Sequence, residues 1–260
     1  MNYTLITGAS SGIGLELAKI FARNNHNLIL VARSTDKLAT LKREIQSTTQ
    51  AQIEIFGADL SLENSAQELY QTVQGKNLSV DILVNNAGVG TYGEFVQTHL
   101  KATQDMIHLN ITTLTELTKL FLPEMLANKS GRILNVASTA SFQPGPLMTV
   151  YYATKAFVLH FSEGLFEELK NSGVTVTALC PGPTESGFQA AAKMENVALF
   201  DTVQLPTSKM VAEYGYTALM DGKPIAVHGA MNKLLSSTVG FLPRTMVRKL
   251  VMKLQKKRLS

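Results

Sequence analysis

Seven short apolar segments recur along this chain, each separated from the next by a stretch of helix length. Most of them are rich in Val, Ile and Leu and nearly continuously apolar, without the alternation of a half-exposed strand. That pattern is typical of strands covered on both faces, as in a parallel sheet. The predicted strands are 3–7, 27–32, 52–56, 81–85, 132–137, 174–179 and 225–229.

Helical periodicity fills the stretches between these strands. Apolar residues recur there at intervals of three or four, for example at Ile13, Leu17 and Phe21. Strict alternation of strand and helix predicts a doubly wound α/β domain of Rossmann type with a seven-stranded, mainly parallel sheet. We expect a single domain over residues 1–260, because no linker, repeat or low-complexity tract divides the chain. Ligands of such folds lie beyond the carboxyl ends of the strands.

The formal net charge of +4 is unevenly distributed. From Gly222 onward there are nine Lys/Arg and no acid, so the first 221 residues carry 15 bases and 20 acids, a net charge of −5. The bases are not interleaved with stacking aromatic residues. We therefore expect no nucleic-acid partner.

Residues 241–260 predict a basic amphipathic C-terminal helix, with Pro243 suited to its first turn. The apolar positions Val247, Leu250, Val251 and Leu254 alternate with the bases Arg248, Lys249 and Lys253. Such a helix can dock on its own domain, pair with a second subunit or lie on anionic lipid. We favour the first two over peripheral membrane contact.

The single cysteine, Cys180, excludes an intrachain disulfide, and the histidines show no metal-ligand spacing. No signal-peptide pattern opens the sequence, and no apolar run approaches the roughly 20 residues that span a bilayer. We expect a soluble, cytoplasmic protein without a metal.

A glycine-rich turn, "TGASSGIG", follows the first strand directly and opens a helix. Gly8, Gly12 and Gly14 allow the backbone to approach a pyrophosphate, which the N–H groups of a helix N-terminus would bind. The spacing resembles the TGxxxGxG motif of the short-chain dehydrogenase/reductase family. The resemblance places Ser10, Ser11 and Ile13 with these glycines in the cofactor site.

The second strand ends in Ala32 and Arg33, where an acid would hydrogen-bond an adenosine ribose and repel a 2′-phosphate. A small neutral residue followed by a guanidinium leaves room for that phosphate and offers it a bidentate partner. This pair favours NADP(H) over NAD(H). The alternative is a solvated arginine at a helix entrance.

Two further strand ends match the family. After the third strand, Asp59 and Leu60 correspond to residues that contact adenine, and Ser61 is a credible helix N-cap. After the fourth strand, "NNAG" at 85–88 matches the family motif residue for residue. Its cofactor-binding members are Asn86, Ala87 and Gly88, although Asn85 or Asn86 could do no more than tie strands together.

The stretch "VYYATK" at 150–155 offers two tyrosines and one lysine. Helical geometry permits either Tyr151 or Tyr152 beside Lys155, since residues at i+3 and at i+4 both lie near residue i. The family resemblance selects Tyr151, because its motif is YxxxK with a serine thirteen residues before the tyrosine, here Ser138. Asn110 in "HLNITT" matches the family's helix asparagine.

The resemblance implies reversible hydride transfer, with Ser138, Tyr151, Lys155 and Asn110 as catalytic residues. A free phenol has a pKa near 10. We expect the cationic Lys155 to lower the pKa of Tyr151, which exchanges a proton with the substrate oxygen that Ser138 orients. Tyr151 and Lys155 also contact the cofactor, Lys155 through the nicotinamide ribose, and Asn110 holds a water of a proton relay.

The sixth strand leads to "CPGPT", similar to the family's PG motif, so Pro181, Gly182 and Thr184 are expected at the nicotinamide. The substrate loop region follows at 185–220, and its first part is apolar and small. Four side chains could line a pocket for an apolar carbonyl compound, although Met and Phe more often fill the core. These four are Phe142, Met148, Phe188 and Met194.

The resemblance runs from Thr4 to about Thr184 with six ordered motifs, and the C-terminal part is loosely similar to oxoacyl and very-long-chain ketoacyl reductases. We expect an NADP(H)-dependent reductase of a small-molecule ketone or aldehyde, apolar or acyl-bearing. Because a fold does not fix a reaction, a non-catalytic dinucleotide-binding regulator and a membrane- or partner-binding module stay open. The resemblance further implies a homodimer or homotetramer, paired through the helices after strands four and five.

Overall fold

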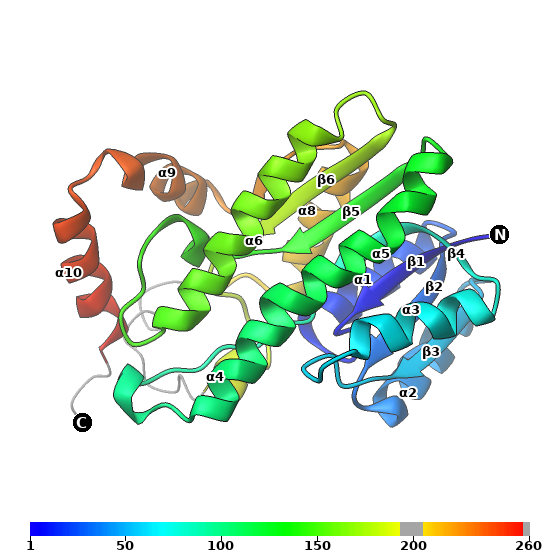
Figure 1. Cartoon of the computed structure of the whole chain (residues 1–260), viewed down its shortest axis with the longest axis horizontal. Coiled ribbons are helices and arrows are strands. Elements are labelled where there is room, and N and C mark those ends of the chain that lie inside the picture. The colour runs from blue at the N-terminus through cyan, green and yellow to red at the C-terminus, as the bar shows by residue number, and fades with distance from the viewer. Residues whose placement is uncertain (193–204, 257–260) are drawn as a thin grey trace.

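The computed structural model describes residues 1–192 and 205–256, and it confirms one seven-stranded sheet (Figure 1). The strand order is β3-β2-β1-β4-β5-β6-β7, and every neighbouring pair is parallel. The strands are β1 Asn2–Thr7, β2 Asn27–Ala32, β3 Ile53–Gly57, β4 Ser79–Asn85, β5 Gly131–Val136, β6 Val174–Cys180 and β7 Ile225–Val227.

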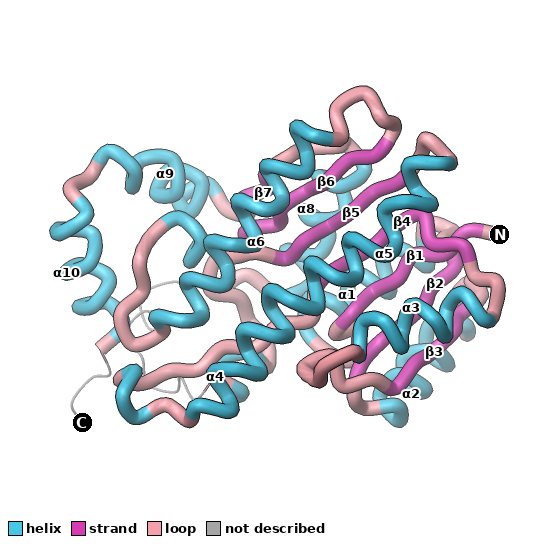
Figure 2. The backbone as a smooth tube through the Cα atoms, viewed as in Figure 1, coloured by secondary structure: helices cyan, strands magenta, loops and turns pink. Residues whose placement is uncertain are grey.

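Helices cover both faces of the sheet (Figures 1 and 2). One face is covered by α1 Gly12–Arg23, α2 Thr35–Gln46 and α8 Ser208–Met220, which contribute Leu17, Leu38 and Val211 to one buried cluster. The other face is covered by α3 Ser65–Gly75, α5 Leu114–Ala127 and α6 Thr149–Glu168. The continuous apolar strands therefore have the two-sided cover that their pattern predicts.

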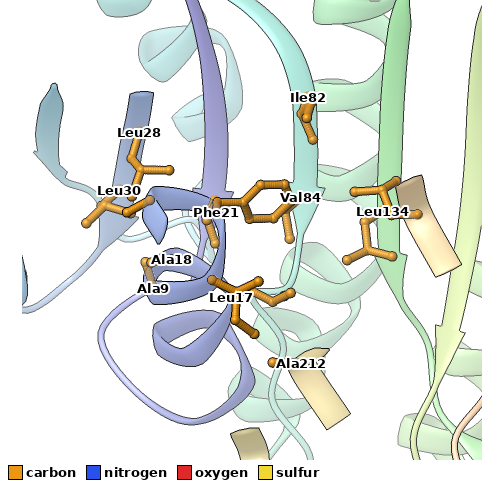
Figure 3. Packing of buried hydrophobic residues seen from close by; sticks show 14 of the residues in the cluster. Ala9, Leu17, Ala18, Phe21, Leu28, Leu30, Ile82, Val84, Leu134 and Ala212 are labelled. Carbon is orange, nitrogen blue, oxygen red and sulfur yellow. The ribbon is translucent and has the colours of Figure 1, made fainter. Parts of the chain in front are cut away.

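Phe21 illustrates how the helical periodicity is used. Its ring is fully buried and lies under the sheet near Val84 and Leu134, with Leu17 one turn earlier on the same helix (Figure 3). Truncating a buried Phe to Ala typically costs about 3–5 kcal/mol. The apolar face of α1 thus fixes the glycine turn against the end of β1.

The direction of strand order reverses between β1 and β4. From β1 the chain builds outward through β2 to β3, and it then returns to place β4 on the other side of β1. In open α/β sheets a crevice forms outside the carboxyl ends of the strands at such a point. The site residues lie around this crevice.

Short elements extend beyond the carboxyl ends of the strands (Figure 1). They are η1 Phe95–Gln97, α4 Leu100–Ile107, η2 His108–Thr113, η3 Thr139–Phe142, α7 Phe188–Ala191, α9 Ala230–Thr238, η5 Val239–Phe241 and α10 Arg244–Gln255. Within the described residues, no helix has both the length and the apolar character needed to cross a bilayer.

Two local expectations are wrong, the helix cap at Ser61 and the end of the last strand. The helix after β3 begins at Ser65 with Asn64 as its N-cap, because Ser61 hydrogen-bonds the Asp59 carboxylate instead of capping. The last strand ends at Val227, since Gly229 turns the chain with a φ of 91°. Within the region 185–220 expected to form the substrate loop, residues 208–220 form α8, which packs into the core.

The predicted C-terminal helix is present as α10 and docks on its own domain. Val247 and Val251 are buried in a cluster with Ala140, Met148 and Tyr152. Pro243 immediately precedes the helix and accepts a hydrogen bond from the Val247 N–H. One side of α10 therefore contacts the helix that carries the tyrosines.

Candidate active site

The glycine turn forms a tight cradle between β1 and α1. Gly8 and Gly12 have φ values of 66° and 58°, which favour glycine. A Cβ on Gly14 would lie 2.4 Å from Asn86 Nδ2, so no larger residue fits there. Ser11 is the N-cap of α1 but makes no side-chain capping bond, and the first turn carries no acid. The N–H groups of this helix end are thus open to an anion.

Asn86 ties the "NNAG" loop to the glycine turn. Its side-chain Nδ2 donates to the carbonyls of Thr7 at 2.9 Å and of Gly8 at 3.2 Å. The Thr7 Oγ1 in turn accepts the backbone N–H groups of Asn86 and Ala87, both at 3.0 Å. Asn86 therefore holds two loops together, while Ala87 and Gly88 present backbone to the crevice.

Asn85 has a different, buried role. Its Nδ2 donates to Asn135 Oδ1 at 2.9 Å and to Thr118 Oγ1 at 3.1 Å, and Asn135 donates to Ser162 Oγ at 2.9 Å. The chain of bonds runs through β4, β5, α5 and α6. Both asparagines of the motif thus make structural hydrogen bonds: Asn85 ties β4 to β5 and α5, and Asn86 ties its own loop to the glycine turn.

Arg33 and Asp59 lie at the ends of neighbouring strands. Arg33 is exposed directly after β2, and no acid follows that strand before α2 begins. The pKa of Asp59 is lowered, first by the hydrogen bond from Ser61 and in smaller part by the Arg33 charge. Leu60 is buried, and its carbonyl accepts a hydrogen bond from Thr113 Oγ1 at 2.7 Å.

The structure brings the Ser138 hydroxyl close enough to Tyr151 to lower the pKa of the phenol. Ser138 stands at the end of β5 as the N-cap of η3, and its Oγ also accepts the Ala140 N–H at 3.1 Å. Tyr151 lies in the first turn of α6. The pairing predicted for Tyr151 over Tyr152 is therefore present in the geometry.

Lys155 is buried one helical turn after Tyr151. Its Nζ donates to the Val136 carbonyl at 2.7 Å and lies 5.9 Å from the Tyr151 ring centroid. Burial lowers the pKa of Lys155 to about 8. A Cβ on Gly88 would lie 3.3 Å from this Nζ, so the amine borders the crevice beneath the "NNAG" loop.

Asn110 lies in η2, a π-helical turn between α4 and α5. Its Oδ1 accepts the Val89 N–H at 3.0 Å, and its Nδ2 donates to the Val89 carbonyl at 2.9 Å and to Thr154 Oγ1 at 3.0 Å. Thr154 donates to the Tyr151 carbonyl. π-Helical turns are rare and are frequent at functional sites, where they shift a side chain out of helical register.

The expectation that Lys155 lowers the Tyr151 pKa is wrong. Burial raises the pKa of Tyr151 above its ordinary value, the Ser138 hydrogen bond lowers it in part, and the neighbouring Tyr152 raises it further. Lys155 is not among the causes, since its amine is directed to Val136. The phenol is therefore protonated at neutral pH.

Tyr152 does more than pack. Its hydroxyl accepts a hydrogen bond of 2.5 Å from Gln255 Nε2 in α10, and the Gln255 carbonyl accepts one of 2.6 Å from Tyr92. Burial raises the pKa of Tyr152 to about 12. Gln255 is not among the residues predicted from the sequence, although it lies four residues after Val251 on the buried side of α10.

The turn after β6 places Pro181, Gly182 and Thr184 at the same edge of the sheet. The Pro181 carbonyl accepts the Thr139 N–H at 2.8 Å, and Thr184 Oγ1 donates to the Gly182 carbonyl at 2.9 Å. A Cβ on Gly182 would lie 2.5 Å from Asn232 Nδ2. Asn232, in α9, is a second residue beside the site that the sequence analysis missed.

Apolar side chains form a wall on one side of Tyr151. The Phe188 ring lies 5.2 Å from the Tyr151 ring, and a Cβ on Gly90 would meet Phe188, Tyr151 and Met148. Phe142 instead packs in a separate cluster around Leu114 and Val158, so it does not line this wall. Met194 lies outside the described residues.

These residues fit a dinucleotide. The glycines let the turn pack closely against the Asn86 loop, and the N-terminus of α1 is open to an anion. The buried Lys155 amine and the Ser138–Tyr151 pair lie further along the edge, beside Gly88. An extended anionic ligand can thus reach from α1 to the tyrosine.

Comparison with known proteins identifies the same family as the motifs do. Residues 2–196 match the profile of the short chain dehydrogenase family. The chain is 33% identical to very-long-chain 3-oxoacyl-CoA reductase-A of Danio rerio over 245 residues, 90% of this chain and 74% of that protein. It is 37% identical to 17-beta-hydroxysteroid dehydrogenase type 3 of Mus musculus over 183 residues, 69% of this chain and 59% of that protein.

A solved structure extends the likeness to three dimensions. A short-chain dehydrogenase from Sphingobium yanoikuyae in complex with NADPH superimposes with a TM-score of 0.82 at 30% identity. The match covers 93% of this chain and 95% of that one. It therefore includes the crevice and most of the elements beyond it.

Proposed function

Because the chain belongs to the short-chain dehydrogenase/reductase family, we propose that it is an NADP(H)-dependent reductase of an apolar or acyl-bearing ketone or aldehyde. One observation carries this proposal. The Ser138 hydroxyl lies beside the Tyr151 phenol at the carboxyl edge of the sheet, and Lys155 and Asn110 converge on Gly88 next to them.

A bound nicotinamide dinucleotide supplies or accepts a hydride at this edge. In reduction, Tyr151 donates its proton to the carbonyl oxygen as the carbon is reduced, and Ser138 holds that oxygen by a hydrogen bond. The raised pKa of Tyr151 keeps the phenol in the protonated form that a proton donor needs. Lys155 would hold the nicotinamide ribose and would add positive charge beside the phenolate that forms.

Proton supply runs through α6 and η2. Asn110 contacts Val89 and Thr154, and Thr154 contacts the Tyr151 carbonyl. We place a relay water at Asn110 and Lys155, from which Tyr151 regains its proton after each turnover. Asn110 is then the residue that orients this water.

Arg33 supports NADP(H). The exposed guanidinium follows β2 without an acid beside it, so a 2′-phosphate meets a bidentate donor and no repulsion. The Sphingobium yanoikuyae relative was solved with NADPH. The apolar wall of Phe188 and Met148 supports an apolar substrate, as do the acyl-CoA and steroid in the relatives' names.

We further propose a cytoplasmic homodimer or homotetramer paired through α5 and α6. Phe157 and Phe161 on α6 stack with ring centroids 5.7 Å apart, and Phe157 is exposed in the single chain. Such a pair is suited to burial between subunits.

The test compares Tyr151→Phe with Tyr152→Phe. Loss of the proton donor should lower kcat for NADPH-dependent reduction by at least about 100-fold, with NADPH binding retained. Tyr152→Phe should keep most turnover. Activity is measured on a panel of apolar ketones and 3-oxoacyl thioesters, and NADPH binding by fluorescence shows that each variant is folded. If Tyr152→Phe abolishes turnover and Tyr151→Phe does not, the assignment is wrong.

A further inference from the structure

The elements α9, η5 and α10, here called the arm (residues 230–255), carry large apolar side chains in solvent. None of the nine residues of α9 is buried. Phe241 in η5 is 90% exposed, although burial of a Phe side chain is worth about 2–3 kcal/mol. The most exposed members are Met231, Leu234, Leu235, Phe241, Met246 and Leu250. Contiguous apolar exposure of this kind marks a surface that another body covers.

α10 separates its two apolar rows. Val247, Val251 and Gln255 recur every four residues and are buried against the domain. Met246 and Leu250 recur with the same interval one position earlier, and they are exposed. The sequence pattern predicts one apolar face, but docking uses only half of it. The other half faces solvent.

Cations flank the exposed row. Lys249 and Lys253 each precede an exposed leucine by one position, and the exposed side of the helix holds no acid. From Gly222 to the last residue there are nine Lys/Arg and no Asp or Glu. In the described part of the arm, none of the bases forms an ion pair with an acid.

The positive charge of the arm distinguishes between the binding partners that could cover it. A second copy of the chain seated on the arm by two-fold symmetry would place bases opposite bases. A surface of anionic lipid instead satisfies both features, since lysines bind head groups while apolar side chains enter the acyl boundary. We propose that the arm docks the protein peripherally on an anionic lipid surface. Its other side stays packed on Tyr152, one residue from the catalytic tyrosine.

The experiment is co-sedimentation of the full chain with vesicles. Vesicles of phosphatidylcholine and phosphatidylglycerol should bind the protein, and vesicles of phosphatidylcholine alone should not. Each Lys or Arg near an anionic surface contributes a factor of about five. Lys249→Glu with Lys253→Glu should therefore weaken binding at least about tenfold, and Phe241→Ser with Leu250→Ser should weaken it as well. Thermal unfolding checks that the variants are folded.

The matched control is Lys170→Glu with Lys223→Glu. Both lysines are exposed at the opposite end of the sheet, and the change in net charge is the same. This variant should keep at least half of the binding strength. Equal losses in both charge variants, or no binding by the unaltered chain, would overturn the proposal. Self-association that Phe241→Ser with Leu250→Ser abolishes, without vesicle binding, would assign the arm to a second copy instead.

Discussion

At the scale of single residues, burial outweighs local charge at the catalytic pair. Lys155 and Tyr151 lie one helical turn apart, yet burial raises the pKa of Tyr151 and lowers the pKa of Lys155, so that it favours the neutral form of each. The lysine is held by a single backbone carbonyl, Val136. Charge brought by a cofactor therefore enters a site in which the phenol is neutral and the lysine pKa is about 8.

Lys155→Met should reveal the free-energy cost of burying the Lys155 charge, in protein prepared without cofactor. The pKa of Lys155 is about 8 when folded and 10.5 as a free side chain, so the unfolded chain binds more protons between these values. The free energy of unfolding then rises with pH across that window. Below about pH 8 the folded protein carries the full cost of burying the charged lysine, and near pH 10.5 it carries none. The wild type should gain stability relative to the variant between pH 8 and 10.

Denaturant unfolding of both proteins at several pH values measures the difference, and the effects of titrating groups that do not interact with Lys155 cancel in it. A difference that does not change with pH would contradict the lowered pKa.

Arg33→Ala should change the affinity for NADPH much more than the affinity for NADH. Hydrogen bonds to charged groups contribute about 1.5–3 kcal/mol, so NADPH affinity should fall about tenfold to hundredfold while NADH affinity changes little. Binding of both is measured by fluorescence titration. Lys37→Ala, at an exposed base in α2, is the control and should leave the ratio unchanged. Equal losses for NADPH and NADH in Arg33→Ala would remove the assignment.

At the scale of elements, α10 closes against α6 through one polar contact in an apolar cluster. The Tyr152 hydroxyl and the Gln255 amide are both buried, and Gln255 Oε1 has no hydrogen-bond partner. A buried pair of this kind costs most when only one partner is removed. The Tyr152–Gln255 pair therefore fixes the orientation of α10 against α6 more than it stabilises the fold.

Gln255→Leu should lower the free energy of unfolding by about 1–3 kcal/mol, because the Tyr152 hydroxyl is left buried without its donor. Gln255→Leu combined with Tyr152→Phe should recover much of that loss. Urea unfolding of the two single variants and the double variant completes the cycle. Strictly additive losses would show that the contact is not coupled.

At the scale of the whole molecule, the stacked ring pair on α6, of which Phe157 is exposed, bears on how subunits assemble. Phe157→Glu should shift the protein from an oligomer to a monomer, since it places a charge where subunits are proposed to pair. Light scattering after size-exclusion chromatography measures the mass. Met210→Glu, at an exposed position on α8 across the sheet, should leave it unchanged. An unaltered mass in Phe157→Glu would exclude this face.

The sequence predicts the sheet well, because a strand buried on both faces must be apolar throughout. It also predicts the Ser138–Tyr151 pair, although spacing within the helix allows Tyr152 and only the family pattern decides. What it misses depends on long-range packing. Gln255 meets Tyr152 across 103 positions, and the Tyr151 pKa follows from desolvation that local spacing does not report.

The bond from Asn86 to the glycine turn has a consequence for protein engineering. The turn is commonly treated as a portable module, a strand and a helix that carry their own phosphate site. Here the carbonyls of Thr7 and Gly8 are satisfied by an amide that lies 78 or more positions later. A graft of residues 1–23 into another scaffold would leave both carbonyls exposed to water. The transferable unit is the turn together with the Asn86 loop.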